Sequence, residues 1–181
     1  MGWFRASPSG EPLVVAMAGI KLGDRLLVVG GSDAKTVAHL ALKPGLSGRA
    51  CVVDEDAATA TRAGETATRE GALIETETAP LTMLPFDPGS FDVVVLNHAL
   101  SKLPDVRRSS ALTEARRVLR DGGRCVAIEA AARGGLAALL GGAATLPAAD
   151  IERALTSANF RAVRTLTERE GLAFIEGAKR G

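Results

Sequence analysis

Short runs of apolar residues alternate with stretches of helical spacing along most of the chain. The apolar runs are rich in Val, Leu and Cys, as in strands that are buried on both faces of a sheet. They predict strands at 25–29, 49–53, 72–75, 91–96 and 124–128. The helical patterns predict helices at 11–20, 33–42, 56–71 and 107–120. Strands that alternate with helices indicate right-handed crossovers and a parallel sheet with helices on both faces.

The last part of the chain has a different pattern. A helix is expected at 151–158, followed by strands at 162–167 and 172–177. Only Glu-Arg-Glu-Gly separates these two strands, and so short a link makes them antiparallel. The prediction is therefore an α/β fold with a doubly wound seven-stranded sheet that ends in an antiparallel C-terminal hairpin. A chain of 181 residues is expected to form a single domain over 1–181, with a short arm and helix at 1–20 and an insertion-like segment at 134–149.

Composition excludes several functions. The 22 basic and 21 acidic residues give a net charge of +1, too little to draw the chain to nucleic acid or to an anionic membrane. No apolar run reaches the roughly 18 residues of a membrane span. Cys51 and Cys125 lack the spacing of a metal site and are expected to be reduced, buried thiols, which favours a cytoplasmic location. No metal site is expected.

Candidate chemistry lies where strands end, because ligands of open α/β sheets bind beyond the carboxyl ends of the strands. Gly30, Gly31 and Ser32 follow the first strand. Glycines there allow a ligand to lie against the backbone, and the next helix offers free N–H groups. The alternative is a tight turn between strand and helix with no ligand.

Asp54 follows the second strand, roughly 20 residues after the Gly-rich turn, where an acidic residue commonly accepts hydrogen bonds from ribose hydroxyls. The alternative is that Asp56, or Asp54 as well, caps the next helix. The full glycine fingerprint of dinucleotide enzymes is absent, and no phosphate-binding Lys follows the turn. A nucleoside ligand without a phosphate therefore fits better than NAD or ATP.

Asn97 and His98 follow the fourth strand. A histidine at that place could act as a base near neutral pH, or it could simply line a pocket wall. His98 is thus the weak candidate for a catalytic residue, and the catalytic set is otherwise unknown.

Three ordered segments carry a resemblance to a known family. They are LPFDPGSFDVVVLNHAL at 84–100, LPD at 103–105 and EARRVLRDGG at 114–123. With these segments the chain resembles the class I S-adenosylmethionine-dependent methyltransferases, especially the small-molecule branch related to ubiquinone/menaquinone C-methyltransferases. The resemblance covers about residues 20–180 and implies a Rossmann-like fold, S-adenosylmethionine as cofactor and a small-molecule methyl acceptor. The cofactor-binding positions it implies are Gly30, Gly31, Ser32, Asp54, Glu55, Leu81 and Asn97.

The chain also departs from the family pattern. The family's acidic-x-Gly-x-Gly-x-Gly motif falls on Val28, Gly30, Ser32 and Ala34, so one glycine of three remains and the acid is absent. If the turn needs a positive φ at Ser32 or Ala34, a Cβ there is costly. The acid that faces the adenine amino group in the family aligns with Pro80.

These departures keep a second hypothesis open: a non-catalytic methyltransferase-like subunit or binding protein that works through a protein partner. The alternatives for the assembly are a homo-oligomer or a complex with a protein partner. The expected arm before the first strand is short for a substrate lid, which also favours this alternative. A nucleotide-dependent oxidoreductase is disfavoured by the missing fingerprint.

Overall fold

The computed structural model describes residues 11–131 and 145–181, so the predicted arm at 1–10 and most of the insertion-like segment fall outside the described part. The described residues form helices and strands in nearly the predicted order. The helices are α1 Leu13–Ala18, α2 Ala34–Ala41, α3 Ala57–Arg69, α4 Asp105–Val118 and α5 Ala148–Ser157. The strands are β1 Arg25–Val29, β2 Arg49–Asp54, β3 Glu75–Thr78, β4 Phe91–Asn97, β5 Leu119–Ala130, β6 Arg161–Arg169 and β7 Leu172–Ala178.

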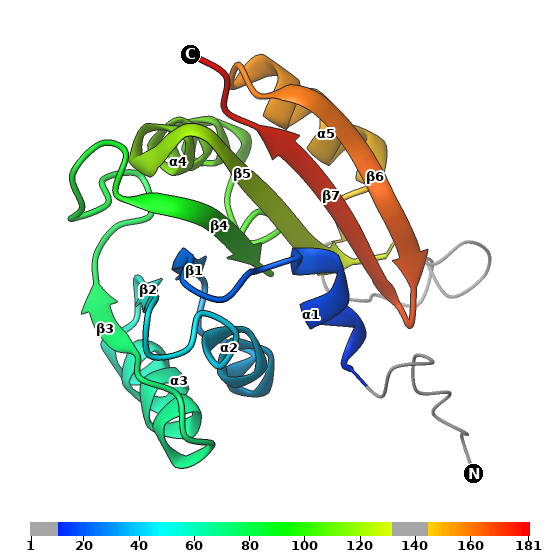
Figure 1. Ribbon diagram of the computed structural model, residues 1–181. Helices are drawn as coiled ribbons and strands as arrows, with labels where there is room; N and C mark the ends of the chain where they lie inside the picture. Colours follow the sequence, from blue (N-terminus) through cyan, green and yellow to red (C-terminus); the bar gives the residue numbers. More distant parts are fainter. Residues whose placement is uncertain (1–10, 132–144) are drawn as a thin grey trace, which may run out of the picture.

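All seven strands lie in one sheet with the order β3-β2-β1-β4-β5-β7-β6 (Figure 1). Strands β1 to β5 pair in parallel, whereas β7 is antiparallel to both β5 and β6. This topology confirms the predicted α/β doubly wound sheet with its antiparallel C-terminal hairpin. The chain reverses its direction of travel across the sheet between β1 and β4, and this topological switch point is where such folds bind ligands.

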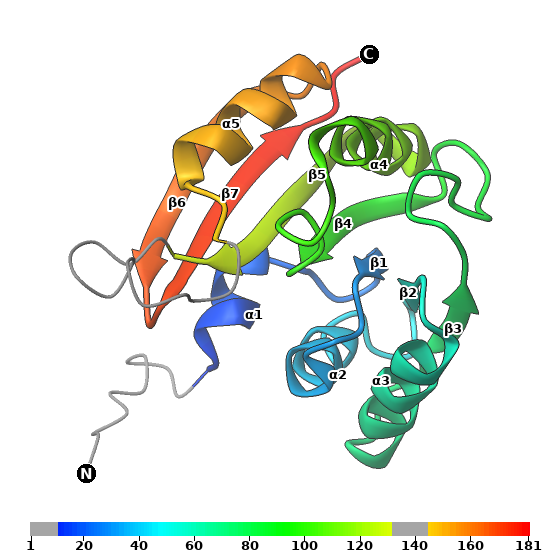
Figure 2. The ribbon, with the colours of Figure 1, turned by 180° about the vertical axis from the view of Figure 1, so that it is seen from behind.

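Two apolar layers hold the helices against the sheet, because alternate strand residues point to opposite faces. Leu27, Val53 and Val94 face α4 and α5, while Val28 and Val52 face α1, α2 and α3. Figures 1 and 2 show these two groups of helices on opposite faces of the sheet. The strands therefore read as continuous apolar runs, since both of their faces are buried.

Strand β3 differs from its prediction. It spans Glu75–Thr78 rather than residues 72–75, and all four of its residues are exposed. The apolar signal before it misled the prediction, because Leu73 is 71% exposed and lies outside the sheet. An edge strand contacts the sheet along one side only, so it can consist of charged residues and Thr without an apolar face.

The boundary between α4 and β5 also differs. The helix ends at Val118 rather than at residue 120, and β5 begins at Leu119 rather than at residue 124. Residues 121–123 were expected to form a turn before the strand, but they interrupt its pairing as a bulge, because Phe91 pairs with Leu119 and Val93 with Arg124. A register shift of this kind leaves no mark in the hydrophobic pattern.

The two cysteines lie in β2 and β5 as free, buried thiols. Burial raises the pKa of both thiols to about 12. Within residues 11–131 and 145–181, no helix has the length and apolar character needed to cross a membrane.

Candidate functional site

The turn between β1 and α2 brings the backbone of Gly30 against the end of β4. Gly30 has a φ of +100°, and a Cβ there would lie 2.4 Å from the carbonyl oxygen of Asn97. Only glycine fits this position. Ser32 and Ala34 have no positive φ, so the backbone cost that their replacement of glycine suggested does not arise. Gly30 is therefore the position of the motif whose backbone requires glycine, and it is the position that retains glycine.

Asp54 lies at the end of β2 and faces this turn. Its Oδ2 accepts a hydrogen bond from Gly31 N at 2.7 Å, and its Oδ1 accepts one from Asp56 N at 2.9 Å. Asp56 is the residue that caps α3, through Thr59 N, so the capping alternative for Asp54 is wrong. A carboxylate offers about four acceptor positions, so each Asp54 oxygen keeps one position for a further donor. Asp54 is oriented and half-buried at the switch point.

Glu55, the next residue, joins three segments. Its Oε1 accepts a hydrogen bond from Leu81 N at 3.1 Å and another from the Nη2 of Arg107, which lies in the first turn of α4. The side chains of Glu55 and Arg107 are 35% and 45% exposed, so the ion pair lies at the protein surface. Two of the expected cofactor-binding residues, Glu55 and Leu81, thus lie side by side and are hydrogen-bonded to each other.

Ser32 also contacts the β4–α4 segment. Lys102 Nζ donates a hydrogen bond to Ser32 Oγ at 2.8 Å, and both residues are exposed. Lys102 and Arg107 come from one segment and reach the ends of β1 and β2. Neither residue had been expected to take part, because their partners lie far away in the sequence.

Asn97 ends β4 beside the turn, and His98 follows it. Asn97 Nδ2 donates to Gly30 O at 3.1 Å, which fixes the orientation of the amide. Its Oδ1 is buried and has no donor within the described residues. His98 is half-buried and has a φ of +51°, an uncommon conformation for a residue with a side chain. The backbone N–H of His98 donates a hydrogen bond to Ile128 O at 2.9 Å, which anchors this residue to β5.

Glu129 is a further buried polar residue that sequence reasoning missed. It lies in β5 at the same end of the sheet and is fully buried. Its carboxylate accepts hydrogen bonds from Leu100 N at 2.7 Å and from Ser101 Oγ at 2.7 Å. Glu129 therefore holds the start of the β4–α4 segment. An acidic residue directly after the apolar run of β5 was the available signal.

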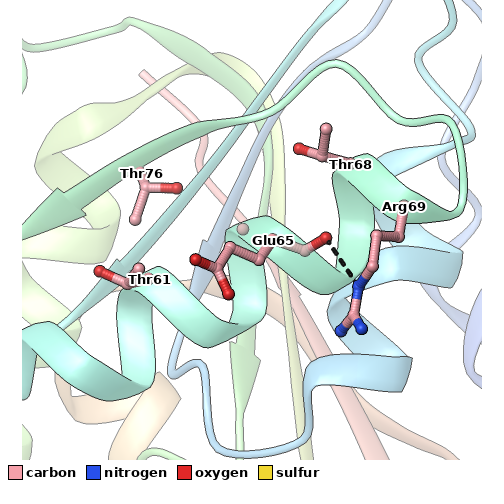
Figure 3. A pocket seen from close by; sticks show the side chains of 6 residues that line it. Thr61, Glu65, Thr68, Arg69 and Thr76 are labelled. Carbon is pink, nitrogen blue, oxygen red and sulfur yellow. Dashed lines mark hydrogen bonds between the residues drawn. The ribbon is translucent and has the colours of Figure 1, made fainter.

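The hollow drawn in Figure 3 lies elsewhere, between α3 and the edge strand β3. It has a volume of about 530 Å³, and its lining includes Glu65, Arg69 and Thr76. No residue expected to bind a cofactor lines it. Within the described parts of the chain, no group of three or more His, Cys, Asp or Glu could hold a metal ion.

Comparison with known proteins identifies the family. The family described as "Methyltransferase domain" matches residues 27–127, which is more than half of the chain and runs from β1 into β5. This chain belongs to that methyltransferase family. Its glycine turn, Asp54 and the end of β4 all lie inside the matched region.

Individual relatives agree with this assignment. The ubiquinone/menaquinone biosynthesis C-methyltransferase UbiE of Geobacter sp. (strain M21) is 39% identical over 61 residues, which are 34% of this chain and 25% of that protein. A S-adenosylmethionine-dependent methyltransferase from Aquifex aeolicus has the same fold, with a TM-score of 0.78 and 17% identity over 95% of this chain and 93% of that one. Human N-acetylserotonin methyltransferase, solved with S-adenosylmethionine, superposes with a TM-score of 0.67 and 19% identity over 93% of this chain and 51% of that one.

Proposed function

We propose that this chain is a S-adenosylmethionine-dependent methyltransferase that acts on a small-molecule acceptor. The observation that carries the proposal is the oriented carboxylate of Asp54 beside the turn at Gly30 and Gly31, at the switch point of a methyltransferase fold. The curated relative, whose name describes a C-methyltransferase of quinone biosynthesis, favours a small acceptor. The two buried thiols fit a reducing, cytoplasmic compartment.

The residues at the site fit such a cofactor in two respects. Asp54 has one free acceptor position on each oxygen, which suits the vicinal hydroxyls of a ribose. Asn97 Oδ1 is a buried acceptor without a donor among the described residues, and an ammonium group is a donor of the kind it lacks. Asp54 and Asn97, with the backbone of Gly30, Gly31 and Ser32, would therefore hold the cofactor.

Bound S-adenosylmethionine supplies an electrophilic methyl group on a sulfonium. The residues of this chain then have the task of holding the acceptor in line and excluding water, which needs few acid–base groups. His98 is the candidate to take a proton from the acceptor, because its side chain is half-buried beside the turn. Glu129 keeps the neighbouring segment in place through Leu100 and Ser101 and has a positioning role.

Calorimetric titration with S-adenosylhomocysteine and S-adenosylmethionine tests the proposal. The wild type should bind both, and Asp54→Ala should bind at least tenfold more weakly, because each lost hydrogen bond to a charged acceptor costs about 1.5–3 kcal/mol. Glu65→Ala, on the exposed face of α3, is the control for the change in charge. Asp54→Asn is a second variant that keeps the size of the side chain. Circular dichroism checks that both Asp54 variants remain folded. Equal affinity of wild type and Asp54→Ala would remove Asp54 from the site.

Two contacts favour a second function. Glu55 accepts a hydrogen bond from Leu81 N, so two of the positions that the family resemblance assigns to the cofactor site bind each other, and Lys102 donates a hydrogen bond to Ser32. A non-catalytic subunit that keeps the sheet and works through a protein partner, or as a homo-oligomer, would tolerate these contacts. Failure of both nucleosides to bind, together with a stable complex in size-exclusion chromatography with light scattering, would favour this second function.

A further inference from the structure

Three arginines line a hollow at the end of the sheet opposite the candidate site. Arg116 comes from α4, Arg161 begins β6 and Arg180 follows β7, and the hollow between them, here called the arginine hollow, has a volume of about 680 Å³. Figures 1 and 2 both show the end of the chain beside α4 and one end of α5. Ala178, the last residue of β7, pairs with Arg124 near the amino end of β5, whereas the candidate site lies at the carboxyl ends of the parallel strands. The arginine hollow is therefore separate from the candidate site, and the inference does not depend on the proposed function.

The backbone of β6 is irregular where it borders the arginine hollow. Arg161 pairs with Ala178 and Arg164 with Glu176, so β6 has one extra residue between these pairs and forms a bulge. Ala162, which lies in the bulge and lines the hollow, has a φ of +50°, an uncommon conformation for a residue with a Cβ. Bulges redirect a side chain and are frequent beside ligand sites. This bulge accompanies the presentation of Arg161 to the hollow.

Arg116 has a structural task besides lining the arginine hollow. It lies in the last turn of α4, and its guanidinium donates to Asn159 O, just beyond α5, at 3.2 Å and to Arg180 O at 3.5 Å. The C-terminus of a helix carries roughly half a negative charge, so Arg116 offsets the ends of α4 and α5. The charges of Arg161 and Arg180 are left over at the hollow.

No acidic side chain neutralises this surplus within the described residues. The ion pairs of residues 11–131 and 145–181 include none of the three arginines. Asp121 lies close to the backbone of Gly181, but it is paired with Lys179 at 3.7 Å and does not line the hollow. A chain with a net charge of only +1 thus concentrates two uncompensated positive charges at one hollow.

We propose that the arginine hollow binds the phosphate group of a small phosphorylated molecule. A phosphate monoester carries a charge of about −1.5 to −2 near pH 7, which matches the surplus of Arg161 and Arg180. The planar guanidinium fork fits phosphate oxygens, and Arg116 keeps N–H groups for the same ligand. The volume of about 680 Å³ lies within the range of roughly 300–1,000 Å³ for small-molecule sites and leaves room for the rest of the ligand. Nucleic acid fits less well, because the nearly neutral chain has no surplus of charge to follow a phosphate backbone.

The test is a titration of the full chain with glycerol 3-phosphate, followed by the NMR signals of the arginine Nε–H groups. The signals of Arg161 and Arg180 should shift and saturate. Arg161→Ala and Arg180→Ala should each bind about three- to tenfold more weakly, the range expected for one exposed, charge-assisted contact. Arg161→Lys keeps the charge but loses the fork, so its affinity should lie between those of wild type and Arg161→Ala. Arg62→Ala is the control for charge, because Arg62 is exposed on α3, and it should bind as wild type does.

Inorganic phosphate and acetate are the comparison ligands. Glycerol 3-phosphate should bind more tightly than either, because acetate carries a single charge and inorganic phosphate leaves the rest of the hollow without contacts. The proposal is wrong if the signals of Arg161 and Arg180 do not shift, if Arg62→Ala weakens binding as much as Arg161→Ala, or if acetate or inorganic phosphate binds as tightly as the ester. A single-stranded oligonucleotide that shifts the same signals at lower concentration than glycerol 3-phosphate would also overturn it, in favour of a nucleic-acid ligand.

Discussion

Asp92 in β4 links three strands at the end of the sheet opposite the candidate site. Its carboxylate accepts hydrogen bonds from Arg25 N at 2.8 Å and Arg25 Nε at 3.0 Å in β1, and from Arg120 Nε in β5. The side chain of Asp92 is 15% exposed, whereas those of Arg25 and Arg120 are 41% and 48% exposed. Asp92→Asn keeps the shape of the side chain but removes its charge. The amide nitrogen of Asn then takes the place of one carboxylate oxygen and faces an arginine donor.

The size of the effect follows from these contacts. The hydrogen bond from the backbone N–H of Arg25 to a charged acceptor contributes about 1.5–3 kcal/mol. The two guanidinium groups are well exposed, so each ion pair contributes only about 0–1 kcal/mol. Asp92→Asn should therefore lower the free energy of unfolding by about 2–4 kcal/mol. For a chain of this size that corresponds to a fall in Tm of roughly 5–15 °C.

The effect should also depend on pH. Burial raises the pKa of Asp92, but the hydrogen bonds from Arg25 and Arg120 outweigh it and hold the pKa well below its usual range. A carboxyl group whose pKa is lower in the folded state stabilises fully above its unfolded pKa of about 3.9, and this stabilisation is lost as the pH falls from there toward the folded value. The difference between wild type and Asp92→Asn should be largest near neutral pH and shrink in acid.

Urea unfolding near neutral pH and below about pH 3.9 measures both quantities. Asp105→Asn is the matched control, because Asp105 also pairs with an arginine but its side chain is 93% exposed, and little change is expected. A loss below about 0.5 kcal/mol for Asp92→Asn, the size of an ordinary surface substitution, would refute the reasoning. So would a difference from wild type that stays constant in acid.

Three other experiments test the turn and the core. Gly30→Ala should lower the free energy of unfolding by about 2–4 kcal/mol in urea, since its Cβ would lie 2.4 Å from a backbone oxygen at a φ of +100°; an unchanged midpoint would contradict the observed turn. Ser32→Gly with Ala34→Gly should bind S-adenosylhomocysteine more tightly in calorimetry, because it removes the side chains of Ser32 in the turn and of Ala34 at the start of α2. Unchanged affinity would show that the turn already accommodates the ligand. Cys125 should resist a thiol reagent in the folded protein near neutral pH, because burial raises its pKa to about 12; rapid labelling without unfolding would contradict its burial.

The hydrophobic pattern predicted the sheet well because buried strands have a strong apolar signal. The alternation of strands with helices predicted the parallel pairing, and the short link between β6 and β7 predicted the antiparallel pairing. Strand β3 was misplaced because its four exposed residues carry no such signal. The start of β5 was missed because a bulge alters pairing without altering hydrophobicity.

The candidate site was predictable only in part. Asp54 and Asn97 could be selected because each follows an apolar strand and parallel strands end at one edge of the sheet. The contacts of Glu55 with Arg107 and of Ser32 with Lys102 could not, because they join side chains 52 and 70 residues apart. Such pairs depend on how a loop crosses the folded sheet. No local pattern in the sequence encodes that path.

The exposed strand β3 affects how separate molecules of this protein associate. As the first strand in the sheet order it has an outer side without a neighbouring strand among the described residues, and unpaired backbone groups of this kind can recruit a strand from another chain. Glu75 and Glu77 place negative charge along this border, and Arg161 and Arg164 place positive charge on β6 at the other border. Charged side chains on edge strands discourage such pairing. The same polarity that hid β3 from a hydrophobic pattern thus disfavours pairing of β3 with the β3 strand of a second molecule.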